Sequence, residues 1–155
     1  SLGNLGLQPA PLNSAEYDCA THVLYRLPTP AAASAFSSLF PSVVAGKTGR
    51  HNYTEWDQIL MGAGAAHPAM NPYNMPQNAE CRRSYTKDMC KRSLDILDQT
   101  VMIPTNPQHT DKEIEDTIHN IATAARIALG GEALDKSRLR PGAAIDAQKF
   151  DLQAS

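Results

Sequence analysis

Residues 101–131 read VMIPTNPQHTDKEIEDTIHNIATAARIALGG, and the fold class follows from this stretch. Its first three residues are β-branched or long and apolar, and Pro104 ends them, as in a short strand. Thr110 and Glu113 have the spacing of a capping box, in which each side chain binds the backbone N–H of the other residue. Apolar residues then recur at helical spacing before a Gly-Gly stop: Ile114, Ile118, Ile121, Ala125 and Leu129. The stretch predicts a strand followed by an amphipathic helix.

The preceding residues predict further elements of both kinds. Residues 22–27 and 42–45 have the composition of short strands. Thr29 followed by Pro30 is typical of a helix start, so we expect an Ala-rich helix over residues 31–40 and another helix over residues 87–98. The predicted fold is therefore α+β. It has a small antiparallel or mixed sheet of about three strands, helices packed on one face in two layers, and a long irregular central loop.

Length, composition and charge limit the function classes. The chain has 155 residues, of which 42% are hydrophobic and 19% charged, as in one packed domain. We place a connecting arm at 1–20, the domain at 21–131 and a polar tail at 132–155. A net charge of -2 argues against nucleic-acid and anionic-membrane binding, and the sequence has no long apolar run. Three unclustered cysteines indicate reduced thiols and a cytoplasmic location. Because residue 1 is Ser, we expect the chain to have been cut or processed.

The central loop is the segment in which we expect a functional site. Residues 46–85 are rich in Gly and Pro, but their aromatic and methionine side chains favour ordered packing. The densest cluster, residues 47–56, combines a cation, an imidazole, an amide and two aromatic rings, which suits an anionic or carbohydrate ligand. The alternative is a packed loop anchored by Tyr53 and Trp56, with Arg50 paired to Glu55. His51 and His67 fit either a functional role or a hydrogen bond to backbone.

Known catalytic and metal motifs are absent from the sequence, and no internal repeat is recognised. The five histidines lack the spacing with which two imidazoles share a metal ion, so we predict no metal site. Cys81 and Cys90 lie near basic residues that would lower a thiol pKa, which leaves a thiol-based enzyme as a third possibility. We favour inert packing of Cys90 on the apolar stripe of its helix.

Three segments together resemble a known family: TGRHNYTEWDQIL, HPAMNPYN and CKRSLDILDQTVMIPTNPQHTDKEIEDTIHNI. They are similar to the C-terminal part of the DegT/StrS-type sugar aminotransferases, which are fold-type I enzymes that use pyridoxal phosphate. The resemblance covers roughly residues 21–129, and its most specific part is residues 90–121. Residues 49–53 resemble the family's TGxHY segment, with Asn52 as an additional residue. The insert around Gly62 departs from the common pattern.

The resemblance implies a small domain that closes over the active site of a large domain. In such enzymes the large domain makes most of the contacts with the cofactor and carries the lysine that forms the Schiff base with it. None of the six lysines here lies in a stretch that resembles that cofactor site, so we expect no catalytic residue in this chain and no transamination by the chain alone. We do not assign cofactor-binding residues. By the same resemblance, the substrate contacts are Arg50, His51, Asn52 and Tyr53, with weaker candidates at Trp56, His67 and Asn71.

The implied substrate is a nucleotide-linked keto-sugar or a keto-cyclitol, with glutamate or glutamine as amino donor. The implied partners are the missing N-terminal large domain and, since the family's active sites form between subunits, a second copy in a homodimer. The alternative is a stand-alone, non-catalytic module that binds a sugar nucleotide or a protein. A detached small domain would expose an apolar face and self-associate, whereas a stand-alone module would be monodisperse.

Overall fold

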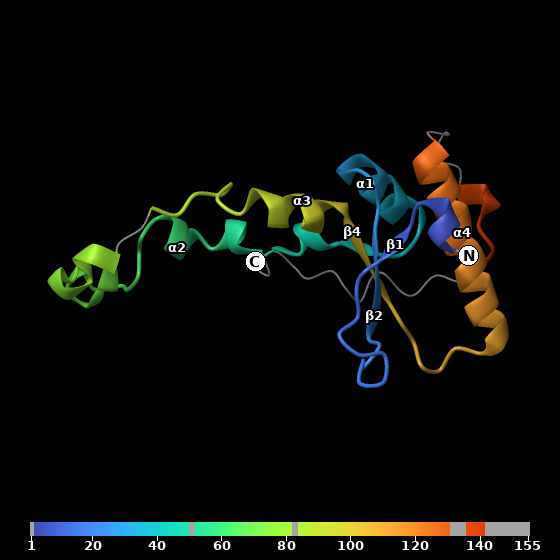
Figure 1. Ribbon diagram of the computed structural model, residues 1–155, viewed down its shortest axis with the longest axis horizontal. Coiled ribbons are helices and arrows are strands. Elements are labelled where there is room, and N and C mark those ends of the chain that lie inside the picture. Colours follow the sequence, from blue (N-terminus) through green and yellow to red (C-terminus); the bar gives the residue numbers. More distant parts are fainter. Residues whose placement is uncertain (1, 50–51, 82–83, 131–135, 142–155) are drawn as a thin grey trace.

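The computed structural model describes residues 2–49, 52–81, 84–130 and 136–141. It is an α+β structure, as predicted, but the antiparallel sheet has four strands rather than about three, in the order β1-β2-β4-β3 (Figure 1). The strands are β1 (Gln8–Pro9), β2 (His22–Arg26), β3 (Val43–Val44) and β4 (Thr100–Pro104). The α-helices in the described ranges are α1 (Pro30–Leu39), α2 (Asp57–Leu60), α3 (Lys91–Gln99) and α4 (Asp111–Gly130). The short 3-10 helices are η1 (Leu2–Leu5), η2 (Ala45–Lys47), η4 (Tyr53–Glu55), η5 (Pro68–Met70), η6 (Pro72–Asn74), η7 (Pro76–Cys81) and η8 (Lys136–Arg138).

The two central strands pair in a register that sets the inner face of the sheet. Tyr25 lies opposite Val101, and Val23 lies opposite Ile103. Val101 and Ile103 are buried, whereas Met102 between them is only half-buried, so the helices cover one face of the sheet. This two-layer arrangement is the predicted one.

The fourth strand comes from the segment predicted to be a connecting arm. Gln8 pairs with Arg26 and Pro9 with Tyr25, which adds β1 to the edge of the sheet. Leu7, just before this strand, is fully buried in the core. The first residues of the chain therefore belong to the folded body, because they supply both a strand and a core side chain.

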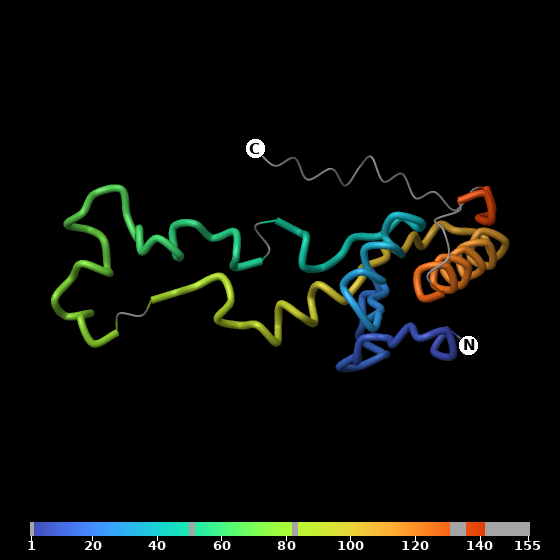
Figure 2. The backbone as a smooth tube through the Cα atoms, turned by 90° about the horizontal axis from the view of Figure 1, so that it is seen from above, coloured from blue at the N-terminus to red at the C-terminus, as the bar shows by residue number. Residues whose placement is uncertain are grey.

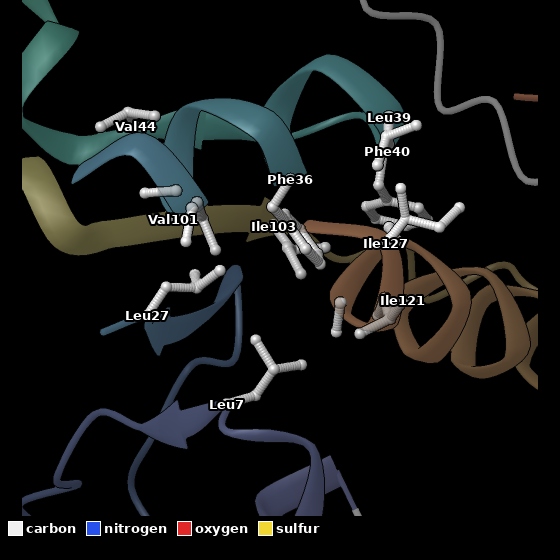
Figure 3. Packing of buried hydrophobic residues seen from close by; sticks show 14 residues of the cluster. Leu7, Leu27, Phe36, Leu39, Phe40, Val44, Val101, Ile103, Ile121 and Ile127 are labelled. Carbon is white, nitrogen blue, oxygen red and sulfur yellow. The ribbon is translucent and has the colours of Figure 1, made fainter. Parts of the chain in front are cut away.

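Helix α1 begins as its sequence predicts. The Thr29 hydroxyl accepts a hydrogen bond from the Ala32 amide at 3.1 Å, and Pro30 takes the first helical position, where its missing N–H is not needed. Phe36 and Phe40 of this helix are both buried, and their ring centroids lie 5.9 Å apart. The core lies between α1, α4 and the inner face of the sheet (Figure 3).

Helix α4 confirms the predicted capping box but corrects the predicted apolar stripe. The Thr110 amide donates to Glu113 Oε2 at 2.8 Å, and the Glu113 amide donates to Thr110 Oγ1 at 3.4 Å. Ile114 and Ile118, however, are 45% and 50% exposed. The first half of the helix instead buries the polar residues Asp116 and Asn120, because residues 136–141 pack over them.

Helix α3 begins later than predicted, at residue 91 rather than 87. Cys90 is the N-cap residue of this helix and is exposed, so its predicted packing on an apolar stripe is wrong. The physical reason is that the Tyr53 hydroxyl binds the Lys87 carbonyl and the Cys90 amide, which holds residues 87–90 in turns before the helix begins.

The predicted irregular loop is a long projection from the body. We call it the arm and define it as the described residues 52–81 and 84–90; it is distinct from the connecting arm predicted at residues 1–20. Its two halves run side by side away from the sheet and meet in a tip at the far end (Figure 2). The arm is built of short turns of helix rather than strands. We call residues 52–56 the base of the arm, residues 61–78 its tip, and the sheet with its covering helices the body. The body positions the base, while the tip must be ordered by its own contacts.

Candidate functional site

The base of the arm carries three of the seven predicted site residues, whereas Arg50 and His51 lie outside the described residues. Asn52 is the N-cap of η4 and is buried, and its side chain accepts from the Thr54 amide at 3.3 Å. The Asn52 side-chain amide also donates to the Gly46 carbonyl at 3.5 Å. Asn52, the additional residue in the TGxHY-like segment, therefore anchors the arm to the body.

Tyr53 joins the two halves of the arm. Its hydroxyl donates to the Lys87 carbonyl at 2.8 Å and accepts from the Cys90 amide at 3.3 Å. These contacts connect residues 34 and 37 positions apart. The hydroxyl thus braces the two halves of the arm. A ligand at this position would contact the half-buried ring rather than the hydroxyl.

Trp56 lies three residues further along and is 46% exposed. It ends η4, and its amide donates to the Tyr53 carbonyl at 3.0 Å. An exposed indole on a backbone held by Asn52 and Tyr53 is a flat apolar surface of the kind on which a sugar ring stacks. Among the described candidates Asn52, Tyr53 and Trp56, Trp56 is the most exposed.

The tip holds the other two predicted site residues, His67 and Asn71. Asn71 is 9% exposed: its side chain accepts from the amides of Tyr73 at 3.0 Å and Gly64 at 3.3 Å, and donates to the Gly62 carbonyl at 3.0 Å. Gly64 packs so closely that an added Cβ would lie 2.7 Å from Asn71 Oδ1. Asn71 is thus the hydrogen-bonding centre of the tip.

A repeated turn, which sequence inspection missed, surrounds Asn71. Pro68, Pro72 and Pro76 each open a short 3-10 turn, four residues apart. The side chains of His67 and Asn71 cap the first two turns by accepting from the amide two residues ahead. The signal in the sequence is the spacing of the prolines in HPAM, NPYN and MPQN, each preceded by a capping or apolar residue.

The structure therefore separates the predicted site residues into two groups. Residues 52–56 lie at the base of the arm, and residues 67–71 lie at its tip, as both views of the chain show (Figures 1 and 2). His67 and Asn71 serve as caps within the tip, which is the backbone-bonded alternative for His67. The candidate site is accordingly the base of the arm.

The arm exposes apolar side chains along its length. Residues 58–79 contain no Asp, Glu, Lys or Arg. Met61 is 74% exposed and Met70 65% exposed, and Ile59 and Met89 are also exposed. An uncharged stretch with exposed apolar side chains, as in residues 58–79, is typical of a surface that meets another protein or domain rather than water alone.

The lysines in the described ranges do not form a site for pyridoxal phosphate. Lys47, Lys87, Lys91, Lys112 and Lys136 are all exposed. Lys91 pairs with Asp95 and Lys112 with Asp116, and Lys47 donates to the Ser34 hydroxyl at 3.1 Å. A Schiff-base lysine needs a water-excluding pocket beside groups that bind the cofactor. The described residues thus do not fit the cofactor.

Three further features of the described residues bear on metal, thiol and pocket sites. Across the described ranges, no three His, Cys, Asp or Glu residues gather as a metal ion would require. Cys19, Cys81 and Cys90 are all exposed free thiols. On the body, an open pocket of about 290 Å³ lies against α1 and β3 and is lined by Ser34, Ser37, Ser38, Ser42, Val43, Val44 and Lys47.

None of the helices in the described ranges combines the length and apolarity needed to cross a bilayer. Comparisons of the chain with protein-family models, with curated proteins and with solved structures find no match. The site must therefore be interpreted from its own geometry and from the sequence resemblance.

Proposed function

We propose that this chain acts as the small domain of a pyridoxal-phosphate-dependent sugar aminotransferase of the DegT/StrS type. In that role it would take no part in the chemistry and would supply contacts to the acceptor, a nucleotide-linked keto-sugar or a keto-cyclitol. Glutamate or glutamine would be the amino donor. A large domain, in a cytoplasmic homodimer, would hold the cofactor.

The observation that carries the proposal is the arm. It leaves the body at the TGxHY-like segment, which is the segment that the resemblance assigns to the substrate. Asn52 and Tyr53 hold the base by hydrogen bonds within the chain, and Trp56 beside them is 46% exposed. A projecting, uncharged tip beyond it supports a role against a second domain.

We assign the cofactor to the large domain and route no step of the chemistry through this chain. What the chain contributes is binding and orientation of the sugar, through ring stacking at Trp56 and, by the sequence resemblance, through the cation of Arg50.

Substitution of Trp56 in the full-length protein that carries this chain tests the proposal. Trp56→Ala should raise KM for the keto-sugar acceptor by about tenfold, because a stacking surface is lost, and should leave KM for the amino donor unchanged. Tyr17→Ala is the matched control, since Tyr17 is an 82% exposed aromatic outside the arm. Equal changes in both KM values, or no change in either, would contradict a role in acceptor binding.

The stand-alone binding module remains the second candidate, and one observation favours it. The tip orders itself through the Asn71 network and the tandem proline turns, and so does not need a second domain to define its shape. Sedimentation of the chain separates the two candidates. A small domain with an unfilled interface should self-associate with rising concentration, and a stand-alone module should remain a single monomeric species.

A further inference from the structure

The open pocket on the body lies beside an outer strand of the sheet. In the order β1-β2-β4-β3, the described strands leave one side of β3 without a neighbour. Val43 and Val44 face opposite sides of the sheet, and a pocket that contacts both of them lies at the edge of the strand. Helix α1 forms the other wall. We call this pocket the edge groove and define it by its lining residues: Ser34, Ser37, Ser38, Ser42, Val43, Val44 and Lys47.

The two outer strands differ in how they are protected from further pairing. Proline has no backbone N–H, and Pro9 takes one of the two positions of β1 at the opposite edge of the sheet. Strand β3 has valine at both positions, and Val43 is 36% exposed. Successive residues of an antiparallel strand direct their backbone groups to opposite edges, so one of the two valines directs its N–H away from β4. The sheet is therefore protected at β1 and open to one more strand at β3.

The serine side chains of the edge groove present hydrogen-bond acceptors. Ser37 Oγ donates to the Ser42 carbonyl at 2.7 Å, and Ser38 Oγ donates to the Ser34 carbonyl at 2.9 Å. Ser42 Oγ donates to the Phe40 carbonyl at 3.0 Å. Each of these hydroxyls has one proton, which its bond to the backbone uses, so the oxygen is left to accept a hydrogen bond from a ligand. The groove thus suits a ligand that brings N–H groups, such as an extended peptide backbone.

The cation of the edge groove is Lys47, and its charge selects the side chain that such a peptide would carry. Lys47 Nζ donates to Ser34 Oγ at 3.1 Å, which leaves two of its three N–H groups for a ligand. Asp98 packs against the neighbouring Gly46, but within the described residues Lys47 forms no ion pair. A carboxylate is the complementary group. A second copy of β3 could not supply it, because residues 19–54 contain no Asp or Glu.

We propose that the edge groove binds an extended acidic peptide segment of a partner protein, which adds to β3 as a fifth strand and places a carboxylate on Lys47. Backbone hydrogen bonds to the open edge of β3 supply affinity for any extended segment, while Lys47 selects an acidic side chain. The edge groove is independent of the proposed function, because it lies on the body and contains no residue of the arm.

Fluorescence polarisation with short labelled peptides and the full chain tests the edge groove. The probe is a mixture of peptides in which Thr and Val are randomised around a fixed central Asp, and a matched mixture has Asn in its place. The wild type should bind the Asp mixture about threefold more tightly, as an exposed ion pair allows, and added salt should remove the difference. Lys47→Gln should bind both mixtures equally. Lys87→Gln removes an exposed lysine of the arm and should keep the preference for Asp.

Methylation of the peptide backbone separates strand addition from a simple surface ion pair. In a paired strand, alternate N–H groups face the neighbour, so N-methylation of one residue in the best-binding Asp peptide should weaken binding about tenfold more than N-methylation of the next residue. Ser38→Phe fills the groove from an exposed position of α1 and should weaken binding of both mixtures at an unchanged unfolding midpoint. No binding of either mixture, a preference for Asp that survives Lys47→Gln, or equal effects of methylation at adjacent residues would overturn the proposal.

Discussion

Tyr53 is the residue on which the shape of the arm most depends, because its hydroxyl holds backbone groups from the returning half. Tyr53→Phe keeps the ring and removes both hydrogen bonds. The expected cost is local and about 1 kcal/mol, since the Lys87 carbonyl and the Cys90 amide can then bind water. Amide hydrogen exchange at Cys90 should accelerate, with little change in the core.

Tyr73→Phe is the matched control for this prediction, because it removes a phenolic hydroxyl from the tip rather than from the base. It should leave exchange at Cys90 as in the wild type. If Tyr53→Phe also left that amide unchanged, the brace would not exist in solution, and the hydroxyl would be free to bind a ligand.

Asp116 makes the stability of the body depend on pH. The hydrogen bond from Lys112, followed by the one from Arg140, holds the pKa of this carboxyl below its ordinary value of 3.8. A folded-state pKa that is lowered adds stability above the unfolded-state pKa, and this stability is lost as the pH falls through the folded-state value. Unfolding in urea should therefore become easier as the pH drops below about 4.

The Asp116→Asn variant should be less stable than the wild type at neutral pH and should show a flatter decline in acid. Lys112→Met and Arg140→Met each remove one of the two cations and should flatten the decline in part. A wild-type acid limb in Asp116→Asn would show that other carboxylates cause the pH dependence.

At the scale of elements, the tip of the arm is a unit that one side chain holds together. Asn71→Ala leaves the Gly62 carbonyl and the amides of Gly64 and Tyr73 without their partner. We expect a local loss of about 2 kcal/mol and faster proteolysis within residues 61–78, while the unfolding midpoint of the body stays the same.

Asn74→Ala provides the comparison, because the Asn74 side chain makes one long contact, 3.4 Å to the Pro68 carbonyl. It should affect proteolysis of the tip far less. Equal effects of the two variants would mean that the tip is ordered by its prolines rather than by the buried amide.

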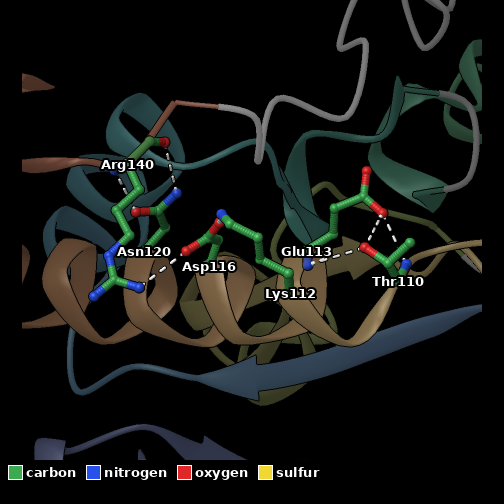
Figure 4. A network of polar contacts seen from close by, with 6 residues as sticks. All are labelled: Thr110, Lys112, Glu113, Asp116, Asn120 and Arg140. Atoms are coloured by element: carbon green, nitrogen blue, oxygen red, sulfur yellow. Dashed lines mark hydrogen bonds and ion pairs between the residues drawn. The ribbon is translucent and has the colours of Figure 1, made fainter.

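The elements differ in how much of them the sequence predicts. Helix α1 and the start of α4 were predictable because their capping residues act over three or four positions. The orientation of α4 was not predictable, since Ile114 and Ile118 fit an apolar stripe. Residues 136–141, which cover Asp116 instead, come from 20 or more positions away (Figure 4). Similarly, Tyr53 binds residues 34 and 37 positions later, a contact without a local signal.

At the scale of the whole molecule, the body and the arm divide the work. The body buries a continuous core under one face of a four-stranded sheet. The arm buries little, exposes Trp56, Met61 and Met70, and extends away from that core (Figure 2). The sequence predicted a functional central loop but not its projection, because the spacing of glycine and proline does not state whether a loop folds back. Under the proposed function, the body supplies stability and the arm supplies the surface that meets the substrate and the large domain.

The central claim is that the chain works beside a cofactor-binding domain, and the coding sequence upstream of Ser1 tests it most directly. We predict an open frame that continues for roughly 200 residues or more and encodes a lysine in a Ser/Gly-rich stretch after a strand. A start codon with its ribosome site immediately before Ser1 would contradict the claim. The arm would then belong to a stand-alone binding module.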